Sequence, residues 1–359
     1  MAIREAAAVR PIPEFADLPE WPRGARLRAI RQAASTFKAR FVAQGTVLGV
    51  RTVPIGYVPY PTRYAFAGAV RGLGPYVFME NRLVVVRFHD FAGAERLLVW
   101  SPAVGAGTRQ APFYRQLSAG YPRWLTERVF SREYHTPVSA LATLNLAPFA
   151  VDFAAFDHLH VQDPRYHLGT TVALAGEAAP REPILPRATF VCQRREVDTL
   201  RDPHPMQWPW YVEDGFAHAR EDRLLEVEAD VELGVGVALV RTPGHTDGNQ
   251  SLVLHTSDGV WVSSENGVCA DNWQPDRSSI RSLRGYATAM GWEVVPNANT
   301  LEDSVDQYDS MVKEKLLADV GSTQEGWLNI LPSTEVLPWR RQGVRPTVYR
   351  GGLSCGRIQ

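Results

Sequence analysis

Apolar side chains recur at intervals of three and four residues near the beginning of the chain. The positions with this spacing are Leu27, Ile30, Ala34, Phe37 and Phe41. Residues spaced in this way share one side of a helix, so the pattern predicts an amphipathic helix from Ala25 to Val42 that packs on the body of the protein. Several prolines precede this helix, and we therefore expect residues 1 to about 22 to form an extended arm.

Between residues 46 and 101 the pattern changes to short runs rich in β-branched and aromatic residues. The runs are Thr46–Val50, Tyr76–Met79, Leu83–Phe88 and Arg96–Trp100. Because turn-forming residues separate them, these runs predict an antiparallel sheet. Residues 121–147 have a more helical pattern, and the apolar run from Phe149 to Phe156 predicts a buried strand.

The second half of the chain predicts further strands and one long helix. The expected strands are Ala188–Cys192, Val235–Arg241, Ser251–His255, Val260–Ser264 and Trp327–Leu331. A helix is expected from Asn299 to Val320, where apolar residues again share one face. Prolines exclude a regular helix between residues 203 and 216, and the tryptophans there indicate a loop that either lines a pocket or packs on the core.

The composition is that of an ordinary globular protein. The 359 residues carry a formal net charge of -1, with 45% hydrophobic and 21% charged residues. This balance favours neither nucleic acid nor an anionic membrane as a partner. No apolar stretch reaches the roughly eighteen residues of a membrane span. Three widely spaced cysteines form no disulfide framework, and we therefore expect a reducing, cytoplasmic compartment.

The candidate chemistry is concentrated in two short segments. Residues 157–163 read Asp-His-Leu-His-Val-Gln-Asp, and residues 242–246 read Thr-Pro-Gly-His-Thr. The histidines at i and i+2, His158 and His160, point to the same side of an extended segment, so one cation can bind both imidazoles if a third ligand arrives from elsewhere. His245 is the candidate third ligand.

The order of these motifs resembles that of the metallo-β-lactamase superfamily, and the surrounding sequence is similar to its lactonase-like members. The resemblance covers roughly residues 46 to 340. Residues 1–45 then form an N-terminal arm and helix, and residues 341–359 form a C-terminal tail. The resemblance implies an α/β fold, a four-layer αββα sandwich with an N-terminal helical extension and with metals at one rim of the two sheets.

Carried over by position, the resemblance implies that the half of the site that holds the first metal is complete. His158, His160 and His245 match its three histidines, and Glu265 takes the place of the bridging aspartate at the end of a predicted strand. Glutamate can supply the same carboxylate on a longer side chain.

The half that holds the second metal is altered. Its aspartate and histidine fall on Gln162 and Asp163, and its last histidine falls near Thr334 and Glu335. An amide is a poor ligand for a divalent cation, whereas Asp163 and Glu335 are hard oxygen donors that can bind manganese, iron or zinc if they converge. Both are also candidate catalytic residues, because Gln162 can orient a water molecule but cannot take its proton.

Three metal arrangements stay open at this point. They are a dinuclear site, a mononuclear zinc site on the three histidines, and an iron site on His158, His245 and Glu265. A divalent metal is expected in each, with zinc favoured and iron or manganese as alternatives. The expected partner is a small-molecule substrate, while its identity and the oligomeric state stay open.

The resemblance implies a hydrolase in which a metal-bound hydroxide attacks an ester, lactone, amide or thioester. One alternative is a mononuclear iron oxidoreductase of the dioxygenase type. Another is a catalytically inactive protein that keeps the fold for binding.

Overall fold

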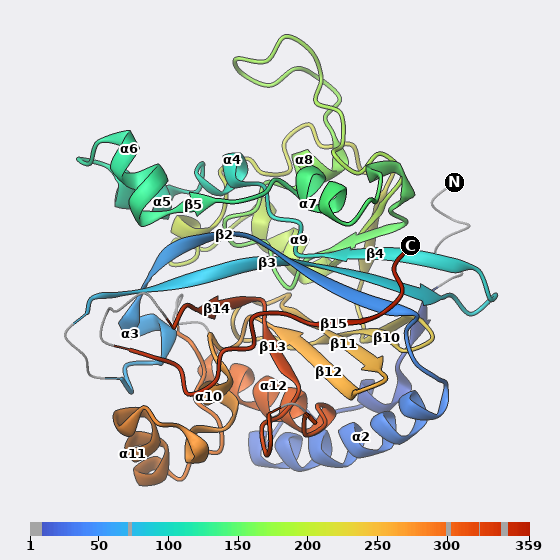
Figure 1. The fold of residues 1–359 in the computed structure, drawn as a ribbon, viewed down its shortest axis with the longest axis vertical. Helices are drawn as coiled ribbons and strands as arrows, with labels where there is room; N and C mark the ends of the chain where they lie inside the picture. Colours follow the sequence, from blue (N-terminus) through green and yellow to red (C-terminus); the bar gives the residue numbers. More distant parts are fainter. Residues whose placement is uncertain (1–8, 71–73, 299–302, 323, 339–343) are drawn as a thin grey trace.

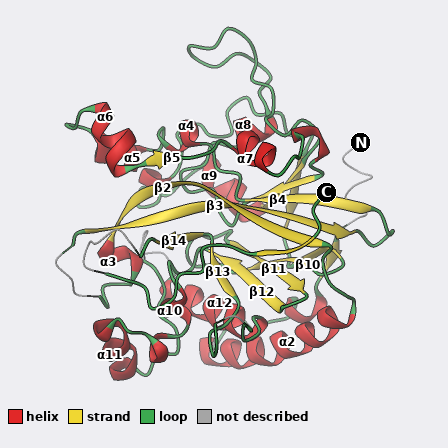
Figure 2. Ribbon diagram, in the orientation of Figure 1, coloured by secondary structure: helices red, strands yellow, loops and turns green. Residues whose placement is uncertain are grey.

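Two β-sheets lie face to face at the centre of the molecule, and helices cover their outer sides (Figures 1 and 2). The computed structural model describes residues 9–70, 74–298, 303–322, 324–338 and 344–359. This arrangement is the four-layer αββα sandwich that the sequence predicts.

The larger sheet has nine strands. Its main path runs β15 (Ser354–Gly356), β2 (Gly49–Pro61), β3 (Tyr76–His89), β4 (Glu95–Trp100), β6 (Phe153–Ala155), β7 (Thr189–Gln193) and β8 (Leu224–Val227). Two short strands pair beside this path, β5 (Arg132–Glu133) with β2 and β14 (Thr334–Val336) with β3. The antiparallel pairing of β2, β3 and β4 confirms the sheet predicted for residues 46–101.

The smaller sheet has six strands. They are, in order, β1 (Arg10–Pro11), β9 (Val231–Gly234), β10 (Val237–Arg241), β11 (Gln250–Thr256), β12 (Gly259–Ser264) and β13 (Ile330–Pro332). All neighbours pair antiparallel except β12 and β13. The described part of the predicted N-terminal arm supplies β1, where an edge position tolerates the missing N–H of Pro11.

Two long helices, α2 (Arg23–Ala43) and α12 (Ser304–Leu317), cover the outer face of the smaller sheet (Figure 1). α2 confirms the predicted amphipathic helix, since Phe37 and Phe41 are fully buried against this sheet. α12 confirms the second predicted helix between residues 304 and 317, while residues 299–302 of that prediction lie outside the described residues.

Shorter helices surround the rest of the sandwich. Over the larger sheet lie α4 (Gly105–Thr108), α5 (Pro112–Ser118), α6 (Arg123–Leu125), α7 (Pro137–Thr143), α8 (Arg165–Leu168) and α9 (Arg194–Arg201) (Figure 1). The remaining helices are α3 (Thr62–Ala65), α10 (Ala270–Trp273) and α11 (Arg281–Met290). A π-helical turn over Thr126–Phe130 follows α6.

The larger sheet is buried on both faces. Along β3, Leu83 and Val85 pack into the cluster under the short helices, whereas Val84 and Val86 pack into the cluster between the sheets. Successive side chains of a strand point to opposite faces, so a continuous apolar run can fill two layers of core.

Some predicted boundaries differ from the structure. The apolar run from Phe149 to Phe156 contains only the short strand β6, because a proline-led 3-10 turn occupies residues 148–150. The predicted C-terminal tail contributes β15 to the larger sheet, within residues 344–359. Within the described part of the chain, every helix falls short of the length and apolar character that a membrane span needs.

Candidate metal centre

Three histidines converge at one point in the described part of the chain. His158 and His160 lie in the loop after β6, and His245 lies in the turn between β10 and β11. One ligand nitrogen from each ring lies within 4.8 Å of the others. The ring centroid of His158 is 4.8 Å from that of His160 and 4.5 Å from that of His245. The structure thus brings together the three histidines that the motifs singled out.

The loop that carries His158 and His160 adopts a strained backbone. Val161 has a φ of 56°, which is rare for a β-branched residue. Its amide donates a 2.6 Å hydrogen bond to the carbonyl oxygen of Trp210, in the aromatic loop. The strain and the short bond hold the loop in one path around the two imidazoles.

The turn that carries His245 depends on its glycine. Gly244 has a φ of 121°, and a Cβ at this position would lie 2.1 Å from the backbone nitrogen of Gln307 in α12. The turn therefore packs directly on the N-terminal half of that helix, and a side chain at residue 244 would push His245 away from the other rings.

Two hydrogen-bond acceptors orient the rings. The Nδ1 of His158 lies 2.9 Å from Oδ1 of Asp157, and the Nδ1 of His245 lies 2.8 Å from Oδ1 of Asn297. The Asn297 amide nitrogen donates to the carbonyl oxygen of Glu265, so its Oδ1 is left to accept from His245. Donation from Nδ1 leaves the Nε2 of both rings as the nitrogen able to bind a cation.

The three imidazoles differ in their affinity for a proton. Burial and the nearby His158 lower the pKa of His245 to about 3, and they lower the pKa of His160 well below its ordinary value. Burial opposes protonation of His158 too, but the charge and hydrogen bond of Asp157 raise its pKa to about 9. His160 and His245 are therefore neutral at pH 7, and a cation has to displace one proton from His158.

A buried carboxylate, Glu196 on α9, joins the segments that carry the histidines. Its Oε1 accepts hydrogen bonds from the Leu159 amide at 2.7 Å and from the Tyr211 hydroxyl at 3.0 Å. Its Oε2 accepts from the hydroxyl of Thr246 at 2.6 Å. The Tyr211 ring also meets the His160 ring edge-on at 4.8 Å. Glu196 thus anchors the residue between the first two histidines and the residue after the third.

Glu265 lines the same small cavity as the three histidines. Both oxygens of its carboxyl group bond to Thr334, one to the backbone amide at 2.9 Å and one to the hydroxyl. Burial and the charge of Asp157 raise the pKa of Glu265 to about 8. No carboxylate of the described residues joins the three ligand nitrogens as a fourth member.

The structure places the other two predicted ligands away from the histidines. Asp163 does not line the cavity, and its carboxylate accepts two hydrogen bonds from the Arg165 side chain, at 2.8 and 3.0 Å. The guanidinium of Arg181 lies 3.3 Å from the same carboxylate. Gln162 faces the cavity, and the next residue along the loop points toward a pair of arginines.

Glu335 is also separate from the cavity. It is fully buried in β14, with its carboxylate 2.8 Å from the guanidinium of Arg82 on β3. Its neighbour Thr334 lines the cavity instead. Adjacent residues of a strand point to opposite faces, so only one of the pair can reach the histidines. Both Asp163 and Glu335 thus pair with arginines and do not line the cavity beside the histidines.

Several residues at the site carry no motif of their own. Trp210 lines the cavity, so the aromatic loop does help to wall it, and Tyr60 lines it from β2. Glu196 and Asn297 are far from the histidines along the chain, and no local pattern in the sequence singles them out. His167 packs between Phe156 and Phe190 in the core and plays no part in the cavity.

No family model matches the chain. Solved structures with a similar fold include a quorum-quenching N-acyl homoserine lactone lactonase, which is 13% identical over 82% of this chain and 95% of that chain, with a TM-score of 0.51. A B. thuringiensis AiiA variant with N-decanoyl-L-homoserine bound at its active site is 14% identical over 81% and 94%, with a TM-score of 0.52. A quorum-quenching N-acyl homoserine lactone hydrolase is 13% identical over 84% and 97%, with a TM-score of 0.51. At this level of identity the comparison establishes the fold alone: the chain has the metallo-β-lactamase fold.

Proposed function

We propose that the protein is a metal-dependent hydrolase of small molecules that contain an ester, lactone, amide or thioester bond. The observation that carries this proposal is the convergence of three imidazoles, two of them with Nδ1 turned to a fixed acceptor. Three histidines with outer hydrogen-bond partners are a ligand set typical of catalytic zinc, in which a fourth position stays open. The solved lactonase structures with the same fold support this reaction class.

One divalent cation, for which zinc is the best candidate, fits the nitrogen ligands His158, His160 and His245. Such a cation polarises a carbonyl oxygen and lowers the pKa of a bound water molecule toward neutrality. The residues themselves keep the rings in place: Asp157 and Asn297 fix the orientation of His158 and His245.

The chain also offers groups that contact the substrate. The Tyr60 hydroxyl is buried and has no hydrogen-bond partner among the described residues, although the residue lines the cavity. A buried hydroxyl without a partner is costly, and a substrate carbonyl oxygen would satisfy it. Gln162 lines the same cavity and can orient a water molecule through its amide.

We propose one cation per chain. The carboxyl groups that a second cation would need already have partners: Asp163 pairs with arginines, Glu335 with Arg82, and the bridging candidate Glu265 with Thr334. Burial and the charge of Asp157 raise the pKa of Glu265 to about 8, which disfavours the charged form that a bridging ligand needs. The proposed site is therefore simpler than a dinuclear one.

The test is metal analysis together with hydrolysis of a small panel of esters, lactones, amides and thioesters. We expect about one zinc per chain, and loss of both metal and hydrolysis in His158→Ala and His245→Ala. The exposed His204→Ala is the control that keeps both. Protein without stoichiometric metal after expression in supplemented medium would refute the proposal.

Two further outcomes separate the alternatives. Iron with oxygen-dependent turnover would indicate an oxidoreductase. Two metals per wild-type chain would contradict the mononuclear site. A second metal gained in Gln162→Asp would show that the other groups of a second site can bind a cation despite their present partners.

A further inference from the structure

The cavity beside the three histidines is small. Its volume is about 80 Å³, whereas sites that enclose a whole small molecule usually measure roughly 300–1,000 Å³. It accommodates the reacting group of a substrate and little more. If this pocket is a hydrolytic centre, as proposed above, the rest of the substrate has to lie elsewhere.

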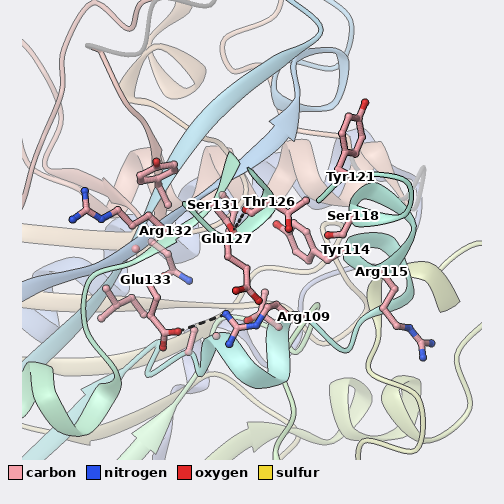
Figure 3. A pocket seen from close by; sticks show the side chains of 18 of the residues that line it. Arg109, Tyr114, Arg115, Ser118, Tyr121, Thr126, Glu127, Ser131, Arg132 and Glu133 are labelled. Carbon is pink, nitrogen blue, oxygen red and sulfur yellow. Dashed lines mark hydrogen bonds and ion pairs between the residues drawn. The ribbon is translucent and has the colours of Figure 1, made fainter. Parts of the chain in front are cut away.

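A second cavity of about 430 Å³ lies next to it (Figure 3). Its lining comes from β2, from Asn81 of β3 and from the segment between Ala103 and His135. That segment contains α4, α5, α6, the π-helical turn and β5, and it joins β4 to the rest of the larger sheet. We refer to this second cavity as the side chamber.

The two cavities have a wall in common. The residues that line both are Val58, Asn81, Ala103, Thr108 and Tyr114. All five are uncharged, and Val58, Ala103 and the ring of Tyr114 are apolar. A substrate that reaches from the histidines into the side chamber would therefore pass only neutral side chains.

Most charged residues of the side chamber have partners or face outward, while the carboxylate of Glu127 lies near the centre of the view in Figure 3. Arg109 lies 3.6 Å from the carboxylate of Glu133, and the two meet in Figure 3. Arg115 pairs with Glu213, outside the chamber, at 3.4 Å. The guanidinium of Arg132 lies 5.6 Å from the ring centroid of Tyr134. Arg115 and Arg132 extend away from the centre of the view in Figure 3. The chamber thus offers no uncompensated cluster of charge to an ionic ligand.

We propose that the side chamber binds the non-reacting part of the substrate, and that this part is an uncharged acyl or alkyl group. The common wall then selects substrates by length and charge. This inference names the substrate class of the proposed hydrolase and rests on that function for its chemical meaning, but the binding itself can be measured without turnover.

The binding test uses zinc-loaded protein and the unbranched amides acetamide and hexanamide, followed by calorimetry. Acetamide fits beside the histidines, whereas hexanamide has to enter the side chamber. Burial of four further carbons predicts that hexanamide binds at least about tenfold more tightly. 6-Aminohexanamide, which places a charge at the far end of the chain, should lose most of that gain.

Two variants, Thr108→Leu and Ala103→Leu, add bulk to the common wall and so narrow the passage between the two cavities. Thr108 is only partly buried, so its replacement serves if the buried Ala103→Leu fails to fold. We expect the ratio of hexanamide to acetamide affinity to fall about fivefold or more, because the added side chain fills the passage. Ala39→Leu, at an exposed position of α2, is the matched control and keeps the ratio.

Hydrolysis of γ-lactones with no side chain or with a hexyl side chain is measured in parallel. Equal affinity for both amides would refute the proposed binding role of the side chamber, even if lactones are hydrolysed. An unchanged ratio of the two affinities in both narrowed variants would refute it as well. An affinity that rises with chain length, and that loses this dependence in the variants, supports the binding role of the chamber. If no bond in the panel is cleaved at the same time, only the proposed hydrolase function is refuted.

Discussion

At the scale of single residues, the candidate centre depends on side chains that never touch a cation. Asp157 and Asn297 orient two rings, and Glu196 accepts hydrogen bonds from the Leu159 amide and the Thr246 hydroxyl, each on the residue that follows one of these histidines. Because such outer partners set the position of each ligand nitrogen, their removal acts on metal affinity more than on the fold.

Removal of the Glu196 carboxylate should weaken metal binding. In Glu196→Ala the Leu159 amide and the hydroxyls of Tyr211 and Thr246 lose their common acceptor, so we expect the Kd for zinc to rise about 10- to 100-fold. Glu196→Gln keeps one acceptor oxygen, so its Kd for zinc should lie between those of the wild type and Glu196→Ala. Competition with a chromogenic chelator measures the effect, and the exposed Glu228→Ala is the control. Unchanged affinity in both variants would show that Glu196 serves packing alone.

Loss of the Tyr60 hydroxyl should affect turnover rather than metal binding. Tyr60→Phe keeps the ring that packs near Trp210, and removes only the group that would bond the substrate oxygen. We expect kcat to fall roughly tenfold to a thousandfold, with the zinc content unchanged. Tyr64→Phe is the matched control, because that hydroxyl bonds to Arg63. If kcat in Tyr60→Phe equals that of the wild type, the Tyr60 hydroxyl does not assist the reaction through a hydrogen bond to the substrate.

At the scale of elements, polar contacts at the first turn of α12 join the two helices that cover the smaller sheet. The Asp303 side chain caps α12 by accepting from the Val305 and Asp306 amides, and it also bonds to the Arg23 guanidinium of α2 at 2.7 and 2.8 Å. The hydrogen bonds from Arg23 hold the pKa of Asp303 well below its usual range. One residue thus fixes where α12 begins and which helix it packs against.

The two roles of Asp303 can be separated by substitution and pH. Asp303→Ala should lower the free energy of unfolding by about 1 kcal/mol through loss of the cap, whereas Asp303→Asn keeps the cap and loses only the charge. Since folding depresses this pKa, the charge contributes fully above the ordinary aspartate value of about 4 and its contribution is lost as the pH falls further. Urea unfolding should therefore show that the free energies of unfolding of the wild type and of Asp303→Asn become more similar as the pH is lowered from 7 to 3. A constant difference over that range would contradict the assignment.

At the scale of the whole molecule, the candidate centre joins the two sheets. His158 and His160 follow a strand of the larger sheet, and His245 follows a strand of the smaller one. Thr334 and Glu265, which also line the cavity, likewise belong to or follow strands of both sheets. A cation held by the histidines would therefore tie the layers of the sandwich together.

Metal binding should accordingly stabilise the entire fold. A ligand that binds only the folded state at about 100 times its Kd adds about 2.7 kcal/mol. At about 2.1 cal/mol/K of unfolding entropy per residue, this corresponds to a rise in Tm of roughly 3–4 °C for a chain of this length. Calorimetry of chelator-treated protein with and without zinc measures the shift, and His245→Ala should show none. An equal shift in that variant would indicate binding elsewhere.

Local information in the sequence was sufficient for several elements of the fold and for the three histidines of the candidate centre, while the sandwich itself was implied by the resemblance to the metallo-β-lactamase superfamily. Periods of two and of three to four residues depend only on neighbouring positions, and they predicted α2, α12 and the antiparallel strands β2 to β4. The spacing of His158 and His160, and the turn around His245, are likewise short-range signals. Their convergence in the structure confirms that part of the prediction.

Only the tertiary structure decided the rest, because the remaining questions concern contacts between distant segments. Whether Thr334 or Glu335 faces the histidines depends on how β14 pairs with β3, where a shift of one residue exchanges the two faces. The capture of Asp163 by Arg165 and Arg181, and the reach of Glu196 to the histidine loops, arise from loop packing that no local pattern encodes. The side chamber also depends on contacts between distant segments, since two strands and a segment that folds over them form its wall.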